Sequence, residues 1–408
     1  MSIKMSLANK TLVAMIVGAV VGFVVGPPIT KIQIVGDIFL RLLQMAIVPL
    51  IFCTVTTAIV NMGDIKKLGR IGLKVFVLFM TTVISAAFLG LIVAQLIRPG
   101  KGLVLTGLPP VKAIAEAPTL TGILTGIIPT NVMQAMAEAN MLQVIVFAIF
   151  SGVAILMLGE ADRLRMGQMF QTLANFVMKI LNLVIETSPY GVFALMAITA
   201  GKYGASVIGP LAQFIASIYA GLILHLAVIL MGLYYFFTRK NPFLFLKKIS
   251  AIWITSITTC STKATMPVSM SVCEQELGIS KDVVGFTIPL GASMNMDANA
   301  LWYGVVAIFV SQLVGIHLTL SQQITAVFLG VLMTLGSPGI PGGIFIATTV
   351  FLKTLGLPLE VIGLLAGVFR IMDMGMTTIN VLGTVFVTAI LGHTEASADT
   401  ESPAAVAP

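Results

Sequence analysis

Charged residues are scarce in this chain: they make up 10% of its 408 residues, whereas a soluble domain carries about 25%. Hydrophobic residues account for 58% of the sequence, and the mean hydropathy is +1.05. A water-soluble chain of this length could not bury so much apolar surface. These figures exclude most soluble enzymes and binding domains, and they predict an integral membrane protein embedded in a lipid bilayer.

Cysteine and histidine are also rare, with three of each. The cysteines lie in apolar segments and are interpreted as small buried hydrophobic residues rather than as disulfide partners. The histidines are too dispersed to suggest a metal centre or a proton-transfer cluster: His225, His317 and His393. An enzyme is therefore not expected.

The net charge of +7 is spread over several short basic clusters, so it does not favour a nucleic-acid partner. Lys and Arg collect in the cytoplasmic loops of membrane proteins. The clusters lie at 1–10, 64–70, 161–165 and 238–248. An even number of crossings between successive clusters places all four on one side. We expect a plasma-membrane protein with both termini in the cytoplasm.

Apolar segments long enough to cross a bilayer, about 20 residues each, recur along the first part of the chain. They fall near 11–27, 37–62, 71–97, 141–158, 167–200 and 207–237. Residues 98–122 are expected to form an external loop, and 129–140 a broken, partly interfacial segment. The polar, alanine- and proline-rich tail at 394–408 is expected to be disordered.

Two later apolar segments are interrupted near their middles: 242–276 by residues 258–267, and 322–356 by "GSPGIPGG" at 336–343. Each half is too short to span a bilayer alone, so each segment is expected to enter and return as a re-entrant hairpin. The non-helical tip must then lie against protein or water, because lipid cannot satisfy its backbone groups.

A long helical segment follows each hairpin, at 281–314 and 358–391, so the hairpin and its helix form a repeated unit. This pattern is typical of inverted-repeat transporters with a site at the bilayer midplane. The alternative is that residues 336–343 form a simple surface loop between two short spans. No Lys/Arg cluster flanks that stretch, as a cytoplasmic loop would require.

A series of motifs in this order resembles one known family over nearly the whole chain. They are "IIPTN" (127–131), "SPYGVFAL" (188–195), "IPLGASMNMDANAL" (288–301), "GSPGIPGG" (336–343) and "DMGMTTINVLGT" (373–384). The chain resembles the dicarboxylate/amino acid:cation symporters, which include the excitatory amino acid transporters and archaeal aspartate transporters. Any one of these motifs alone would be weak.

The resemblance implies an all-α membrane protein with eight transmembrane helices and two re-entrant helical hairpins. It implies a scaffold formed by residues 1–70 and 101–205. Residues 71–100 and 206–393 would form a transport unit that moves across the membrane as an elevator. It also implies a homotrimer.

Asp297 lies inside a long apolar region, where an ionised carboxylate is costly unless it is paired or holds a cation. Hard cations favour oxygen ligands. In the family, residues matching Asn295, Asp297 and Thr82 bind a sodium ion, whereas a further hydroxyl of that site falls on Val83. We expect this site to be present but weakened. The alternative is a protonated or lysine-paired Asp297 with no ion.

A second family sodium site uses carbonyls matching Gly291, Asn295 and Asn380 plus a carboxylate whose position is Thr384 here. A neutral hydroxyl offsets a cation less well in a low dielectric, so this site is expected to be weak or absent. A third site uses carbonyl oxygens around three residues: Thr334, Leu335 and Ser337. Carbonyl ligands tolerate side-chain changes, so it could survive.

The resemblance also implies how a substrate would be held. Asp373 matches the residue that binds the α-amino group, and Asn380 matches one that binds the α-carboxylate. Backbone N–H groups near Thr262 and 340–342 would assist, as helix N-termini do for anions. The alternative for Asn380 is an inter-helix hydrogen bond. The expected substrate-binding residues are Ser261, Thr262, Lys263, Asn299, Ile340, Gly342, Asp373, Met376, Thr377 and Asn380.

Met376 departs from the family pattern, because relatives that carry acidic amino acids commonly have an Arg there for the side-chain carboxylate. Thr377 beside it is retained. We therefore expect the pocket to favour a small amino acid with a neutral side chain. Arg370, at i and i+3 with Asp373, could instead pair with that carboxylate.

Lys263 occupies a position in the first hairpin tip where the family usually has a serine, and three roles are open. It could contact an acidic substrate, act as a counter-ion to Asp297 or Asp373 in place of a sodium ion, or extend to cytoplasmic water. A lysine that releases its proton there could also couple transport to protons. The counter-ion role predicts reduced sodium dependence.

The main hypothesis is a secondary active symporter for a small neutral amino acid, with sodium as the coupling cation and protons as a second candidate. One alternative is an acidic amino-acid or C4-dicarboxylate symporter that uses Lys263 for the side-chain carboxylate. An alternative of another class is a passive channel or a ligand sensor on the same fold.

Overall fold

The computed structural model describes residues 7–61, 65–101, 128–138, 141–335, 343–359 and 361–401, and every regular element in these ranges is helical. This confirms the all-α fold class for that part of the chain. The elements are α1 (Leu7–Val25), η1 (Pro27–Ile32), α2 (Gln33–Met45), α3 (Ile47–Asn61), α4 (Ile65–Ile97), α6 (Val132–Ala137), α7 (Met141–Leu156), α8 (Glu160–Glu186), α9 (Ser188–Tyr203), η2 (Gly204–Val207), α10 (Ile208–Leu224), η3 (His225–Leu230), α11 (Met231–Thr238), α12 (Pro242–Lys248), α13 (Ser250–Thr259), α14 (Thr262–Gln275), α15 (Lys281–Met294), α16 (Asp297–Leu313), α17 (Leu320–Leu335), α18 (Gly343–Thr354) and α19 (Val361–Glu401).

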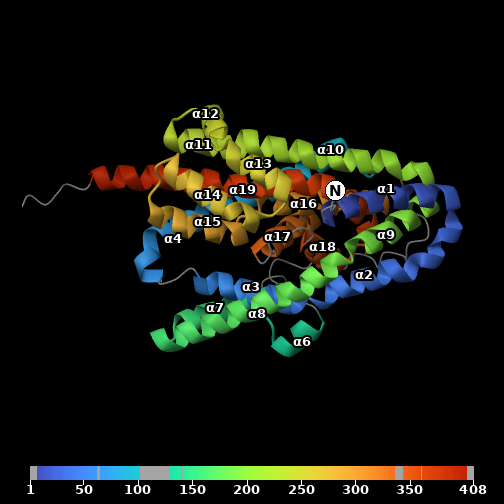
Figure 1. Cartoon of the computed structure of the whole chain (residues 1–408), viewed down its shortest axis with the longest axis horizontal. Helices are drawn as coiled ribbons and strands as arrows, with labels where there is room; N and C mark the ends of the chain where they lie inside the picture. Colours follow the sequence, from blue (N-terminus) through green and yellow to red (C-terminus); the bar gives the residue numbers. More distant parts are fainter. Residues whose placement is uncertain are drawn as a thin grey trace, which may run out of the picture.

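The helices form two groups that lie side by side (Figure 1). In one group, α3 packs against α7 and α8, and α1 packs along α9. In the other, α19 packs against α10, α13, α14 and α15, and α16 lies between α4 and α17. Contacts of α9 with α19 join the groups. The main hydrophobic core runs through α16, whose side chains are nearly all buried, and through much of the described part of α19.

Three helical segments are long and apolar enough to cross a membrane: Gly72–Ile97, Gly209–Thr238 and Ile371–Glu395. Shorter apolar helices lie at Val13–Val25, Val48–Thr57, Gln143–Leu156 and Leu320–Thr334. The expected multi-pass character is therefore visible in the helices themselves.

Close packing of α1 on α9 depends on glycine. A Cβ on Gly18 would lie 2.6 Å from the carbonyl oxygen of Phe193, and one on Gly22 would overlap the carbonyl oxygen of Ala197. The two glycines are four residues apart and share one helix face, which is the small-residue spacing that lets membrane helices approach closely.

The single span expected over 167–200 is wrong, because the structure divides it into α8, which ends at Glu186, and α9, which begins at Ser188. Pro189 lies in the first turn of α9, where its missing N–H and fixed φ suit a helix start but not a helix interior. The two helices then pack in different places, α8 on α3 and α9 on α1.

The first interrupted segment folds back on itself, as expected. Cys260 adopts a left-handed conformation (φ 49°) that ends α13, and Ser261 accepts the backbone N–H of Ala264 at 3.2 Å to begin α14. The two helices pack against each other as a hairpin. In the second interrupted segment, α17 and α18 also pack together, while the residues between them, 336–342, lie outside the described ranges.

The helix expected over 281–314 breaks at Asn295 and Met296, which have non-helical backbone angles (φ/ψ −96°/73° and −105°/62°). Asp297 then opens α16, where the helix dipole favours a negative charge. By contrast, α19 is continuous and extends through Glu401, well beyond the expected start of the tail at 394. Its end is tied to α4 by an ion pair between Lys74 Nζ and Glu395 Oε1 at 2.5 Å.

Candidate substrate and cation site

A cavity lies where the tip of the α13–α14 hairpin meets the start of α16, α18 and the middle of α19. Its lining is Cys260, Thr262, Met296, Asn299, Ile344, Phe369, Asp373, Met376, Thr377 and Asn380. Six of the ten expected substrate residues are among them. Four of these six, from Asp373 to Asn380, are spaced i, i+3, i+4 and i+7, so one face of α19 presents them together.

Asp373 is 7% exposed and is the one acidic side chain in this lining. The hydroxyl of Thr377, one turn further along α19, donates to Asp373 Oδ1 at 3.2 Å. A carboxylate that is mostly removed from water attracts a cationic group strongly, because little solvent screens it. This end of the cavity therefore favours a cationic group over an anionic one.

Asn380 joins α19 to the start of α16. Its Oδ1 accepts the backbone N–H of Ala298 at 2.8 Å, and its amide nitrogen donates to Asn299 Oδ1 at 3.1 Å. Met296, the residue before α16, gives no side-chain cap, so Asn380 caps this helix from a distant position. The inter-helix hydrogen bonding expected as the alternative for Asn380 is therefore present, and both polar atoms of the amide take part in it.

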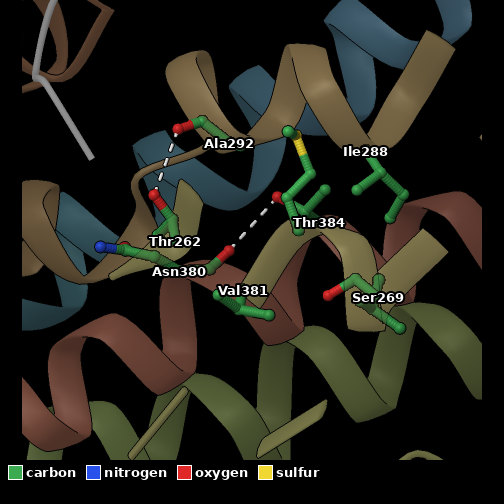
Figure 2. Close-up of a pocket in the computed structure, with 9 residues that line it drawn as sticks. Thr262, Ser269, Ile288, Ala292, Asn380, Val381 and Thr384 are labelled. Atoms are coloured by element: carbon green, nitrogen blue, oxygen red, sulfur yellow. Dashed lines mark hydrogen bonds between the residues drawn. The ribbon is translucent and has the colours of Figure 1, made fainter. Parts of the chain in front are cut away.

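A second, smaller pocket separates α14, α15 and α19 (Figure 2). Thr262 donates to the carbonyl oxygen of Ala292 at 3.4 Å, and Thr384 donates to that of Asn380 at 3.3 Å. No charged side chain is among its lining residues in the described ranges. Thr384 also packs against Gly291, where an added Cβ would lie 2.5 Å from its Oγ1.

Asp297 lines neither pocket and is 0% exposed. The amide nitrogen of Asn295 faces Thr82 Oγ1 at 3.0 Å and Asp297 Oδ1 at 3.3 Å, while its oxygen accepts the N–H of Thr384 at 3.1 Å. Thr82 in turn donates to the carbonyl oxygen of Phe79 at 3.0 Å. The structure thus brings Thr82, Asn295 and Asp297 together as a buried polar cluster.

The basic side chain that lies against Asp297 is a residue that the sequence did not single out. Nε2 of His225 lies 3.2 Å from Asp297 Oδ2, and both side chains are 0% exposed. The contact joins residues far apart in the sequence, so no local motif could reveal it. One signal was available: a histidine in the middle of a 30-residue apolar helix is an ionisable group within the expected membrane span.

Of the other expected site residues, some lie on the described helices and some lie outside the described ranges. Lys263 is exposed on α14 and forms no ion pair within the described residues, so its expected counter-ion role is not seen at Asp297 or Asp373. Thr334 is buried on α17, and Leu335 is the last residue of that helix. Ser337, Ile340 and Gly342, and the side chain of Arg370, lie outside what the structure describes.

Comparisons with known proteins agree with the family that the motifs suggested. The sodium:dicarboxylate symporter family matches residues 7–394. A proton/glutamate-aspartate symporter of Bacillus subtilis (strain 168) is 34% identical over 389 residues, covering 93% of this chain and 92% of that protein.

Two further relatives have different substrates in their names. A proton/sodium-glutamate symport protein of Geobacillus stearothermophilus is 30% identical over 403 residues (96% and 95% coverage). A C4-dicarboxylate transport protein of Bacillus subtilis (strain 168) is 32% identical over 401 residues (96% and 94%). The chain therefore belongs to the sodium:dicarboxylate symporter family, and it is an integral membrane transporter rather than an enzyme.

Proposed function

We propose that this protein is a cation-coupled symporter of an amino acid, whose α-amino group binds Asp373. The observation that carries this proposal is the buried carboxylate of Asp373 in a cavity beside a hairpin tip. An α-ammonium group can pair with this carboxylate, whereas a plain dicarboxylate has no ammonium group. The names of the glutamate and glutamate-aspartate relatives support the same substrate class.

The charge of the substrate side chain is the point on which the observations diverge. Met376 is 1% exposed in the cavity lining, and no basic side chain is among the described lining residues, which favours a neutral amino acid. The relatives carry glutamate, aspartate or C4-dicarboxylates according to their names, which favours an acidic substrate. The comparisons give the acidic substrate the broader support, and Lys263, exposed on the hairpin, is its candidate partner.

We also propose that a cation, sodium or a proton, enters with the substrate. The cluster of Thr82, Asn295 and Asp297 supports one sodium site, in which the Asn295 amide would turn its oxygen towards the ion. Thr384 donates to the Asn380 carbonyl and supplies no negative charge, which supports a weak second site. The carbonyls near Thr334 and Leu335 remain the proposed third.

The proposed movement is that of an elevator. Residues 71–100 and 206–393 would form the transport unit, with the α13–α14 and α17–α18 hairpins re-entrant from opposite faces of the membrane. Residues 1–70 and 101–205 would form the scaffold. The scaffold and the transport unit together would contain eight transmembrane helices. The separate packing of α3 with α7 and α8 supports this division. The homotrimer and the cytoplasmic termini rest on the resemblance and the charge pattern alone.

Thermal unfolding of the purified protein tests the substrate class, because a ligand that binds the native state raises the melting temperature. Aspartate, glutamate, succinate, serine and alanine would each be added with sodium chloride and with choline chloride. Stabilisation by amino acids but not by succinate supports the role of Asp373. Stabilisation by succinate alone contradicts it. The contrast of aspartate with serine then decides the side-chain charge.

A channel or a sensor is separated from a carrier by counterflow in proteoliposomes. Saturable exchange of a labelled amino acid against an internal pool of the same amino acid is expected of a symporter. An unsaturable current would indicate a channel, and binding without exchange would indicate a sensor.

A further inference from the structure

The buried contact between His225 and Asp297 has no part in the proposed sodium ligand set. Nε2 and Oδ2 are 3.2 Å apart, and both side chains are fully buried. Within the described residues, His225 is the one basic side chain at ion-pair distance from Asp297. The carboxylate therefore already has a polar partner inside the protein.

The backbone around His225 is irregular. The helix from Gly209 to Thr238 is α-helical except over η3, a π-helical turn that begins at His225. A π-turn is a rare interruption of an α-helix that frequently occurs at functional sites. Here η3 packs between α4, which carries Thr82, and α19. The irregular turn thus starts at the residue that reaches the proposed cation site.

The two oxygens of Asp297 face different partners. Oδ1 faces the Asn295 amide nitrogen at 3.3 Å, towards Thr82. Oδ2 faces His225, yet neither ring nitrogen nor Oδ2 has a hydrogen-bond partner within the described residues. Buried polar atoms without hydrogen bonds destabilise a protein. The separation of 3.2 Å between Nε2 and Oδ2 is within the range of N–H···O hydrogen bonds.

We propose that His225 is a specificity-determining residue for cation coupling, because its imidazole and the coupling cation compete for the Asp297 carboxylate. The inference rests on the proposed sodium site at Asp297. With no ion bound, an N–H of the ring stabilises Oδ2. When sodium binds, the carboxylate turns towards the ion and the imidazole contact weakens. The free energy gained when sodium binds Asp297 is then partly offset by loss of the contact between Asp297 and His225, and this lowers the affinity for sodium.

This competition needs no change in the protonation of either group, because a neutral imidazole with its hydrogen on Nε2 is already a donor. The surroundings leave the contact between His225 and Asp297 as the main electrostatic interaction of this carboxylate. The neighbouring side chains of the cluster are uncharged: Thr82, Asn295 and Thr384. Val83 acts in the same direction, because it provides no oxygen for the ion.

The test is thermal unfolding of the full-length protein while sodium chloride replaces choline chloride at constant ionic strength. His225→Leu removes the competitor, so the sodium concentration at half-maximal stabilisation is expected to fall about threefold or more. His225→Gln retains an N–H donor at similar reach and is expected to stay near the wild type. His225→Asn is shorter, cannot reach Oδ2, and should behave as His225→Leu does.

A merely structural role for His225 would lower the melting temperature equally with and without sodium, leaving the half-maximal concentration unchanged. That result in His225→Leu overturns the inference and leaves the proposed sodium site intact. If the leucine variant does not fold, the same result in His225→Asn does so. Asp297→Asn should remove the difference in half-maximal sodium concentration between His225→Leu and the wild type, because it removes the carboxylate charge for which the ring and the ion compete. His317→Gln, at an exposed position, is the control for losing a histidine. A wild type that does not respond to sodium overturns the proposed sodium site and this inference together.

Discussion

Gly383 of α19 lies directly against the carboxylate of Asp297. A Cβ at Gly383 would overlap Oδ2 and would lie 2.9 Å from the side-chain amide group of Asn295. The absence of a side chain on α19 thus gives the carboxylate its place between α19 and η3. The sequence showed Gly383 as one glycine among 38, and the contact distinguishes it from the others.

We predict that Gly383→Ala displaces the Asp297 carboxylate and weakens the sodium response of the protein. Overpacking of a buried site typically costs about 1–3 kcal/mol, so a lower melting temperature is also expected. The measurement is thermal unfolding with sodium and with choline. Gly285→Ala is the matched control, because Gly285 is exposed on α15 and an added Cβ there meets no atom within 4 Å. An unchanged sodium response in Gly383→Ala would contradict the assignment of Asp297.

Asp373→Asn keeps the shape of the side chain and removes its charge. An amino-acid substrate should then bind at least about tenfold more weakly, since a charge-assisted hydrogen bond contributes roughly 1.5–3 kcal/mol. Binding of a C4-dicarboxylate, which has no ammonium group, should not weaken. Isothermal titration with aspartate and with succinate separates the two. A variant that loses both equally would show that Asp373 acts on the fold and not on the amine.

The site residues of α19 show which structural features can be predicted from the sequence. The spacing of Asp373, Met376, Thr377 and Asn380 places them on one helix face, and the structure has all four in one cavity lining. The hairpin turn was also predictable, because neither half of its apolar segment could span a bilayer. Periodicity and length are local properties, and a single sequence contains them.

Other features depend on pairs that are distant in the sequence. His225 meets Asp297, and Asn380 caps α16, because of how whole helices pack. The division of residues 167–200 was missed for a different reason, since an apolar run hides the effect of Pro189 on the helix. A proline at that point could have indicated the break.

Asn380 is predicted to stabilise the protein before any substrate binds. Asn380→Ala leaves the Ala298 N–H without its cap and the Asn299 oxygen without its donor. A lost cap costs about 1 kcal/mol and each buried unpaired group about 1–3 kcal/mol, so a marked fall in the melting temperature is expected without ligand. Ser311→Ala is the control, because Ser311 is buried on α16 and its hydroxyl donates to the Ile308 carbonyl of the same helix. Equal melting temperatures for the two variants would leave Asn380 a substrate ligand and nothing more.

Thr384 offers a way to rebuild the second sodium site. Its hydroxyl lies beside the Asn380 carbonyl and against Gly291, the residues whose carbonyls the family site uses. Thr384→Asp would add a negative charge there, and a carboxylate attracts a monovalent cation far more strongly than a hydroxyl in a low dielectric. We expect the steepness of the sodium dependence of transport to rise towards one additional ion, together with a lower melting temperature in choline, where the new charge is unpaired. Thr384→Asn, of the same size but neutral, controls for the altered packing. Sodium curves of equal steepness in Thr384→Asp, Thr384→Asn and the wild type would mean that these carbonyls do not form a cation site in this chain.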